Sequence, residues 1–287
     1  MNTILEVQGL TKKYKKSDFH LNNISFSLQS GTIMGLVGEN GSGKTTTIGC
    51  ILNTLIKDGG TVKLFGKEMA DGSPEIRDDI GFVFDANCFS NDFTAKKLSS
   101  VMRRIYSKWD DDLYYEYLKK FNLPVTQKIK TFSKGMSVKL RIAIALSHHP
   151  RLLILDEATS GLDPIVRDDI LDVFLDFVQD ENNSILLSSH ITSDLEKIAD
   201  YITYIHNGDV ILSEKKDELI YNYGVIRCKA SQFAKIDPQD ILAYKKRDYQ
   251  IDVLISDRRA AEKKYGDFII DNVSIEEIML ILVKGEK

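Results

Sequence analysis

The stretch GENGSGKT, Gly38 to Thr45, decides how this chain folds. It has the form GxxxxGK[ST] and lies between an apolar run, IMGLV, and a helical pattern, TTTIGCILNTL. Glycines at these positions let successive backbone N–H groups converge on phosphate oxygens, while the lysine supplies a cation and the threonine hydroxyl can bind Mg²⁺. A strand, a loop and a helix in this order predict a nucleotide-phosphate site in an α/β protein.

The composition sets the class of protein to which this loop belongs. The chain has 287 residues, of which 43% are hydrophobic and 28% charged, as in ordinary soluble globular proteins. A net charge of −4 argues against a nucleic-acid binder that uses a basic face. The three widely spaced cysteines, Cys50, Cys88 and Cys228, indicate reduced thiols in the cytoplasm. No apolar run approaches the roughly 18 residues that span a bilayer.

Strand-like runs alternate with helical patterns on both sides of the loop, which predicts a mainly parallel sheet with crossover helices. The segment at about residues 87–150 is dominated by helical patterns, and we interpret it as a helical insertion. Near the end of the chain, three strand-like runs precede an amphipathic helix, SIEEIMLILVKG. We therefore expect a main domain over residues 1–213 and a small accessory α+β domain over residues 214–287.

A second group of polar residues follows the apolar run RLLIL. Asp156 and Glu157 stand at the carboxyl end of that predicted strand, where ligands bind in parallel sheets. Asp156 can join the shell of a Mg²⁺ ion, and Glu157 can polarise an attacking water. Asp163 precedes a proline and has the pattern of a helix N-cap, while His190 ends the next strand-like run. The nucleotide site and His190 are therefore expected at one edge of the sheet.

Taken in order, these features resemble the ATP-binding subunit of ABC transporters, over roughly residues 1–213. The resemblance implies an α/β P-loop NTPase fold with a mainly parallel core sheet, an N-terminal antiparallel β subdomain, a helical insertion and a small C-terminal α+β tail. It implies ATP and Mg²⁺ as ligands, and ATP hydrolysis coupled to transmembrane transport. It also implies a head-to-tail homodimer of ATPase subunits, held at the cytoplasmic face of the membrane by a separate permease. No nucleic-acid partner is implied.

The resemblance assigns roles to the residues of these motifs. Glu157 and His190 become catalytic, Asp163 belongs to the D-loop, and Thr45 with Asp156 holds Mg²⁺. The expected nucleotide-binding residues are Tyr14, which would stack on adenine, and Gly38, Asn40, Gly41, Ser42, Gly43, Lys44, Thr45 and Thr46.

The turn Phe132-Ser133-Lys134-Gly135-Met136 occupies the position of the family's LSGGQ signature, which binds the γ-phosphate of ATP held by a second copy. Ser133 would donate its hydroxyl and Gly135 its backbone N–H, with the helix dipole behind them. Lys134 replaces a glycine and Met136 a glutamine, so the side-chain contacts of the family are not carried over to these two positions.

Asp85 stands where the family carries the glutamine of its Q-loop. A carboxylate there can reach Mg²⁺ or its water, although its stem is shorter than that of glutamine. Residues 86–93 follow and are expected to face the membrane partner.

The signature variant, Asp85 and the short tail are similar to the ABC-2-type exporter branch, which handles antimicrobial or cytotoxic peptides, such as bacitracin, lantibiotics or phenol-soluble modulins, and some drugs. The resemblance thus implies the motor of a peptide or drug exporter. The alternative is a soluble ABC ATPase of an assembly or repair system, which a neighbouring permease gene would argue against. A GTPase or small-molecule kinase is disfavoured, because no NKxD motif is present.

Overall fold

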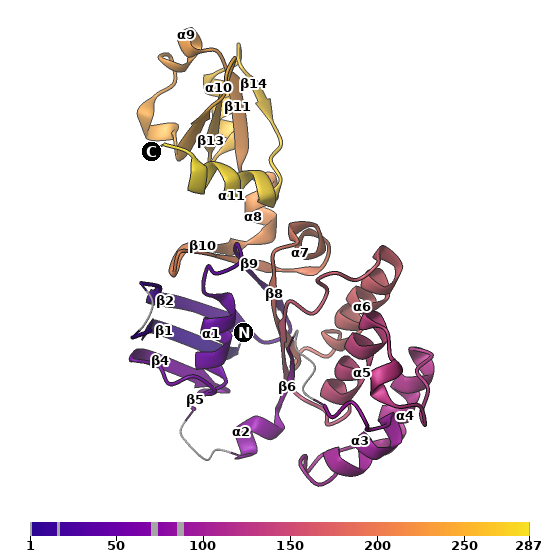
Figure 1. The fold of residues 1–287 in the computed structure, drawn as a ribbon. Helices are drawn as coiled ribbons and strands as arrows, with labels where there is room; N and C mark the ends of the chain where they lie inside the picture. The colour runs from indigo at the N-terminus through magenta and orange to yellow at the C-terminus, as the bar shows by residue number, and fades with distance from the viewer. Residues whose placement is uncertain (1, 16–17, 70–73, 85–88, 287) are drawn as a thin grey trace.

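The computed structural model describes residues 2–15, 18–69, 74–84 and 89–286 and arranges them around three sheets (Figure 1). The central sheet has the strand order β10-β9-β3-β8-β7-β6. Its strands are β3 (Ile33–Val37), β6 (Ile80–Val83), β7 (Leu152–Asp156), β8 (Ser184–Ser189), β9 (Tyr201–His206) and β10 (Asp209–Lys215). All neighbours pair in parallel except β9 and β10. The predicted mainly parallel sheet is confirmed.

Both faces of the central sheet are covered, which is why β3, β7 and β8 are buried along their whole length. Side chains of a strand alternate between the two faces. On β7, Leu153 and Leu155 pack toward the helices, whereas Leu152 and Ile154 pack toward the N-terminal sheet. The sequence needs near-continuous apolar runs at these strands for this reason.

The N-terminal part of the chain forms the antiparallel sheet that the resemblance implied. Its order is β2-β1-β4-β5. The strands are β1 (Thr3–Lys13), β2 (His20–Gln29), β4 (Gly59–Leu64) and β5 (Lys67–Glu68). Leu21, Ile24 and Leu28 of β2 are buried at alternating or near-alternating positions and share a core with Ile48 of α1 (Lys44–Ile51). This core fixes α1, and with it the loop that α1 follows, between the two sheets.

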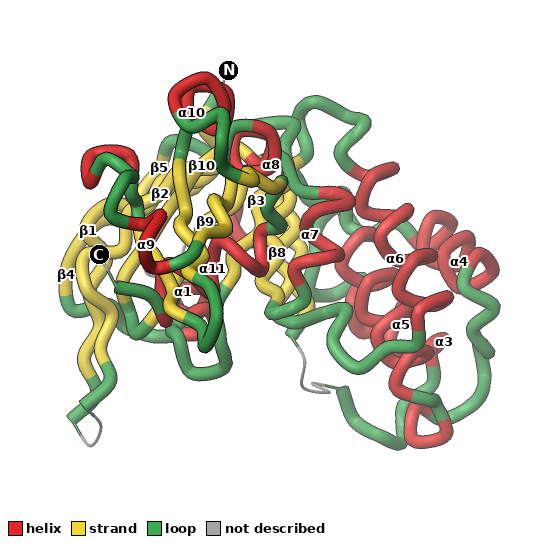
Figure 2. The backbone as a smooth tube through the Cα atoms, turned by 90° about the horizontal axis from the view of Figure 1, so that it is seen from above, coloured by secondary structure: helices red, strands yellow, loops and turns green. Residues whose placement is uncertain are grey.

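A group of helices covers the other face of the central sheet (Figures 1 and 2). Apart from the short α2 (Pro74–Asp78), the helices of this part are α3 (Ala95–Met102), α4 (Asp111–Lys120), η1 (Ile129–Thr131), α5 (Lys134–Leu146), α6 (Pro164–Phe177) and α7 (Thr192–Ile198). Side chains cap the starts of four of them, namely Thr94, Asp110, Ser133 and Asp163. None of the helices in the described ranges has the length and apolar character needed to cross a membrane.

The C-terminal part forms an antiparallel sheet of order β12-β13-β11-β14. Its elements are α8 (Lys216–Tyr221), β11 (Gly224–Cys228), α9 (Ala230–Phe233), η2 (Pro238–Asp240), β12 (Ala243–Lys246), β13 (Ile251–Ile255), α10 (Arg258–Lys264), β14 (Ile269–Asp271) and α11 (Ile275–Lys284). One face has its own core around Ile226 and Val253, while α11 joins the main core through Ile278 and Ile281. The α+β character matches the expected tail; the division after residue 213 stays a prediction.

Candidate nucleotide site

The phosphate-type loop connects β3 to α1, and its glycines are required by its shape. Gly41 and Gly43 have φ values of 83° and 117°, in the left-handed region that favours glycine. A Cβ on Gly43 would lie 2.6 Å from a methyl carbon of Leu21, so a larger residue would also collide with the core. No side chain caps α1 at Gly43, and the first N–H groups of this helix therefore remain donors for an anion.

Lys44, the first residue of α1, places a buried ammonium group beside this loop. Its Nζ donates to the carbonyl oxygens of Gly38 at 2.7 Å and Glu39 at 3.2 Å, and lies 3.2 Å from Glu157 Oε1. Within the described residues Glu157 Oε1 has no aligned hydrogen bond, so this contact is an ion pair only. A buried charge requires such partners, and here the loop and one carboxylate supply them.

Asp156 ends β7 and is buried next to the start of α1. Thr45 Oγ1 donates to its Oδ2 at 2.8 Å, and Ser188 Oγ on β8 donates to its Oδ1 at 2.6 Å. The two hydroxyls fix the carboxylate plane. Hydroxyl and carboxylate oxygens are the ligands that Mg²⁺ prefers, and Mg²⁺ sites commonly use only one or two protein carboxylates together with substrate phosphates. Thr45 and Asp156 therefore fit a nucleotide-bound Mg²⁺.

Glu157 follows Asp156 with a φ of 53°, which is uncommon for a residue with a side chain. Its N–H lies 3.1 Å from Ser188 Oγ and 3.2 Å from the Ser188 carbonyl oxygen. Its Oε2 lies 2.6 Å from Nδ1 of His190, which follows the end of β8. The adjacent parallel strands β7 and β8 end at the same edge, and this brings the carboxylate and the imidazole into contact. Such a carboxylate can accept a proton from a bound water.

Other predicted nucleotide residues surround the start of α1. Tyr14, at the end of the strand β1, is partly exposed, and its hydroxyl lies 3.3 Å from Thr46 Oγ1. Asn40 is exposed on the loop. The Ser42 hydroxyl is buried and, among the described residues, has no hydrogen-bond partner, so it has capacity for a ligand oxygen.

The signature-like turn forms the start of α5. The Ser133 hydroxyl accepts from the Met136 N–H at 3.2 Å, so Ser133 is the N-cap. The Lys134 side chain lies against the turn at Gly161. A Cβ added to Gly161 would be only 2.7 Å from Lys134 Nζ. None of the hydrogen bonds or ion pairs found in the described ranges links residues 133–136 to Lys44.

The remaining predicted site residues are Asp163 and Asp85. Asp163 caps α6, because its Oδ1 accepts from the Val166 N–H at 3.0 Å. Asp85 lies outside the described residues.

Sequence reasoning did not single out Ser188. This serine contacts both Asp156 and the N–H of Glu157 from the neighbouring strand. A signal was present, because Ser188 and Ser189 are adjacent hydroxyls in the apolar run SILLSS, directly before His190. Hydroxyl groups in a fully buried strand need specific hydrogen-bond partners.

Comparison with known proteins gives a consistent result. A family model described as "ABC transporter" matches residues 21–160. The ABC transporter ATP-binding protein YtrB of Bacillus subtilis (strain 168) is 31% identical over 220 residues, which cover 77% of this chain and 75% of YtrB. The bacitracin transport ATP-binding protein BcrA of Bacillus licheniformis is 35% identical over 215 residues, covering 74% of this chain and 69% of BcrA.

A third relative and one solved structure extend this comparison. The lantibiotic transport ATP-binding protein SrtF of Streptococcus pyogenes is 32% identical over 216 residues, covering 75% of this chain and 92% of SrtF. A solved structure described as the ATP-binding subunit of an ABC transporter superimposes with a TM-score of 0.66 at 27% identity, covering 75% of this chain and 91% of that one.

Proposed function

This chain belongs to the ABC transporter family as an ATP-binding ATPase subunit, and from that premise we propose that it is the motor of a membrane exporter. One observation supports this proposal above the others. The start of α1, the end of β7 and the residue after β8 meet at one edge of the central sheet, where Lys44 contacts Glu157, Thr45 contacts Asp156, and His190 contacts Glu157. ATP hydrolysis requires a cation, a metal-holding carboxylate and a base in such an arrangement.

In this proposal the loop and the start of α1 bind the phosphates of ATP through backbone N–H groups, and Lys44 pairs with the β- and γ-phosphates. Thr45 and Asp156 would hold Mg²⁺, which would supply positive charge against the phosphates. Tyr14 offers its ring to the adenine, and the free Ser42 hydroxyl offers a further contact to phosphate.

Glu157 is the proposed base, and its contacts with Lys44 and His190 support a way in which ATP would activate it. Glu157 Oε1 lies 3.2 Å from Lys44 Nζ. Phosphate oxygens would replace this carboxylate as the partner of Lys44, and Oε1 would then be free to accept a hydrogen bond from the attacking water. His190 keeps the other oxygen in place through its contact at 2.6 Å.

The proposed working unit is a head-to-tail homodimer. Ser133 and Gly135 of one copy would contact the γ-phosphate held by Lys44 of the other, because these residues have no link to Lys44 among the described contacts within one chain. The exposed Lys134 side chain lies on the same surface as Ser133, and Asp163 would approach the loop of the second copy. A two-fold axis makes both sites equivalent.

A permease would dock on an apolar cavity of about 960 Å³ on the side of the molecule where α2 and α3 lie. Phe82 and Ile105 line this cavity and are both substantially exposed, and Phe84 and Tyr106 extend it. Contiguous exposed apolar side chains are typical of a surface that another protein covers. We assign this surface to a cytoplasmic segment of the permease, which would hold the subunit at the cytoplasmic face of the membrane.

The cargo we propose is a peptide of the antimicrobial or cytotoxic kind. This follows the relatives whose names include bacitracin transport and lantibiotic transport.

The experiment is co-expression with a candidate permease, a polytopic membrane protein encoded by a neighbouring gene, followed by ATP-dependent peptide uptake into inside-out vesicles. We expect uptake with the wild-type pair and none with Glu157→Gln. Phe82→Asp should lose the membrane protein on purification, whereas Ile56→Asp should retain it, because Ile56 is even more exposed but lies outside the cavity. An ATPase that never binds this membrane protein would contradict the exporter proposal.

A further inference from the structure

We propose that the C-terminal helix α11 forms part of the contact between two copies of this chain, by completing a pocket that receives Ile165 of the second copy. The inference rests on the proposed head-to-tail dimer. It assigns to the C-terminal part of the chain, which carries none of the nucleotide-site residues, a place in the ATP-dependent interface.

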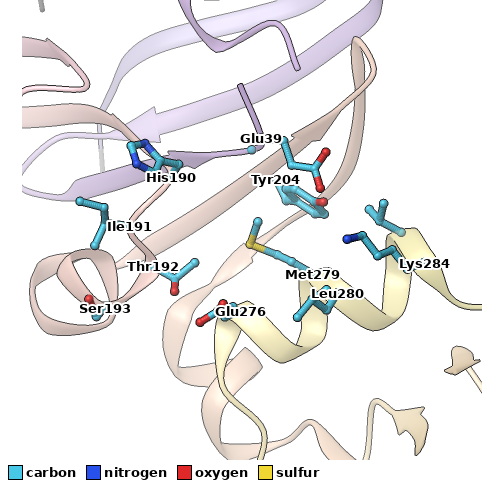
Figure 3. Close-up of a pocket in the computed structure, with 12 residues that line it drawn as sticks. Glu39, His190, Ile191, Thr192, Ser193, Tyr204, Glu276, Met279, Leu280 and Lys284 are labelled. Atoms are coloured by element: carbon cyan, nitrogen blue, oxygen red, sulfur yellow. The ribbon is translucent and has the colours of Figure 1, made fainter. Parts of the chain in front are cut away.

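The pocket has a volume of about 470 Å³ and three walls. Gly38 and Glu39 of the phosphate loop form one wall, and residues 190–193, from His190 to the start of α7, form the second. The third wall is α11, through the apolar Met279, Leu280 and Val283, with the charged Glu276 and Lys284 at either end. Figure 3 shows Met279 extending from α11 toward Tyr204, with Glu39 and Lys284 nearby. The pocket therefore lies directly beside the nucleotide site but takes its apolar wall from another part of the chain.

The position of α11 is fixed by contacts on its other faces. Ile275, Ile278 and Ile281 are buried in the main core. The N–H of Ile275 donates to Glu196 Oε1 of α7 at 2.9 Å, and this carboxylate lies at the positive end of the α11 dipole. Although these contacts hold α11, Leu280 remains 37% exposed. A helix with apolar residues beyond its buried face is typical of one that is covered by a partner.

The chain also carries an exposed apolar residue that matches this pocket. Ile165 is 76% exposed in the first turn of α6, which Asp163 caps. In the head-to-tail arrangement, Asp163 of the second copy approaches the phosphate loop of this chain. The pocket borders that loop at Gly38 and Glu39, so Ile165, two residues after Asp163, is brought to its opening.

The consequence is a direct link between the C-terminal part and closure of the dimer. Each copy offers one Ile165 and one α11 pocket, so a two-fold axis forms two such contacts. Burial of Ile165 and Leu280 adds apolar stabilisation to the closed state. Since α7 follows His190 and contacts α11 through Glu196, a ligand or protein that displaces α11 would weaken both the interface and the support of the segment after His190.

Cysteine cross-linking tests the contact directly. All chains are full length, carry Cys88→Ser, and carry Glu157→Gln to retain bound ATP. One chain carries Ile165→Cys and the other Leu280→Cys, and they are mixed, oxidised and separated on a non-reducing gel. We expect a cross-linked dimer with ATP and Mg²⁺ that disappears without ATP. Leu242→Cys replaces Leu280→Cys in the matched control, because Leu242 is also 37% exposed in the C-terminal part but does not line the pocket.

The outcomes separate this inference from the proposed function. If light scattering shows an ATP-dependent dimer but the 165–280 pair gives no more cross-link than the 165–242 pair, the inference is wrong and the shared site stands. If no ATP-dependent dimer forms at all, the shared site and this inference both fail. As a second measurement, Leu280→Asp should lower the dimer fraction at a given ATP concentration while ATP binding to the single chain is retained. Leu242→Asp should leave the dimer fraction unchanged.

Discussion

Ser188→Ala is the most informative single substitution, because it removes one hydroxyl that supports two site residues. Ser188 Oγ donates to Asp156 Oδ1 at 2.6 Å and lies 3.1 Å from the Glu157 N–H. After substitution, Asp156 Oδ1 would remain buried without this donor. The Glu157 N–H would keep its contact with the Ser188 carbonyl oxygen at 3.2 Å. The loss therefore falls mainly on the carboxylate proposed to hold Mg²⁺.

The size of the effect follows from the charge of the acceptor. A hydrogen bond to a charged group contributes about 1.5–3 kcal/mol, and the free energy of unfolding should fall by about this amount. Asp156 would then be oriented by Thr45 alone. Loss of a group that orients a metal ligand typically lowers metal affinity or activity by about 10–100-fold, and we expect the same for Mg²⁺-dependent ATP turnover.

Ser184→Ala is the matched control, because Ser184 lies at the other end of the same buried strand. Its hydroxyl accepts from the Gly31 N–H at 3.1 Å and donates to the Gln29 carbonyl oxygen at 3.2 Å, and both partners are neutral. Ser184→Ala should lower the free energy of unfolding by about 0.5–1.5 kcal/mol for each hydrogen bond lost, and it should leave turnover at saturating ATP unchanged. Urea denaturation and steady-state ATPase assays over a Mg²⁺ series measure both quantities. If Ser188→Ala keeps the turnover and Mg²⁺ dependence of Ser184→Ala, the proposed role of Ser188 is refuted.

Further substitutions test the rest of the site. Lys44→Ala should abolish turnover, by a hundredfold or more, and weaken ATP binding; normal turnover in an ATPase assay would remove the assignment. Glu157→Gln should bind ATP without hydrolysis and accumulate a dimer in light scattering; hydrolysis near the wild-type rate would show that Glu157 is not the base. Mixing inactive Lys44→Ala with inactive Ser133→Arg should restore some ATPase activity, because one site of the heterodimer is then intact. A tagged pull-down would show that the chains exchange, and a linked dimer would show that a single site can turn over. If activity does not return under these conditions, the shared site is refuted. Burial lowers the pKa of His148 despite its contacts with backbone carbonyls, so the neutral form is favoured in the folded state. Burial of neutral His148 therefore contributes stability above its ordinary pKa of about 6.5, and this stability is lost as the pH falls below that value. Between about pH 7.5 and about pH 5.5, the urea midpoint should drop less in His148→Gln than in the wild type. Equal drops would show that His148 is not the source of this pH dependence.

The sequence was sufficient for those parts of the fold that depend on local patterns. Positive φ angles at Gly41 and Gly43 are a local requirement that glycine meets, so the loop is visible as a motif. Buried parallel strands need continuous apolar runs, and the carboxyl ends of neighbouring strands share an edge. Together these rules predict that Glu157 and His190 lie close to one another, and Glu157 Oε2 lies 2.6 Å from His190 Nδ1.

Contacts between distant segments could not be predicted in this way. The Ile275 N–H donates to Glu196 Oε1 across 79 positions of the chain, and no local pattern relates the two residues. Ser188 is a similar case, because its role depends on the register that places it opposite Asp156 on β7. Local sequence predicts which element a residue joins, whereas such contacts depend on how the elements pack.

In the proposed mechanism, the contact between Lys44 and Glu157 would make ATP and a second copy necessary for activity, although one chain carries the cation, the metal-holding carboxylate and the base. Two charged groups buried next to each other are stabilised mainly by their mutual attraction, and separating them without replacement is costly. Here the cation and the base neutralise one another at 3.2 Å. In the proposed mechanism, the triphosphate is the anion that would take Lys44 away from Glu157, and the helix start at Ser133 of a second chain would offer N–H groups and a hydroxyl to the same γ-phosphate. Hydrolysis would then be tied to closure of the dimer, because Glu157 would become a free base under the same conditions that bring the two copies together.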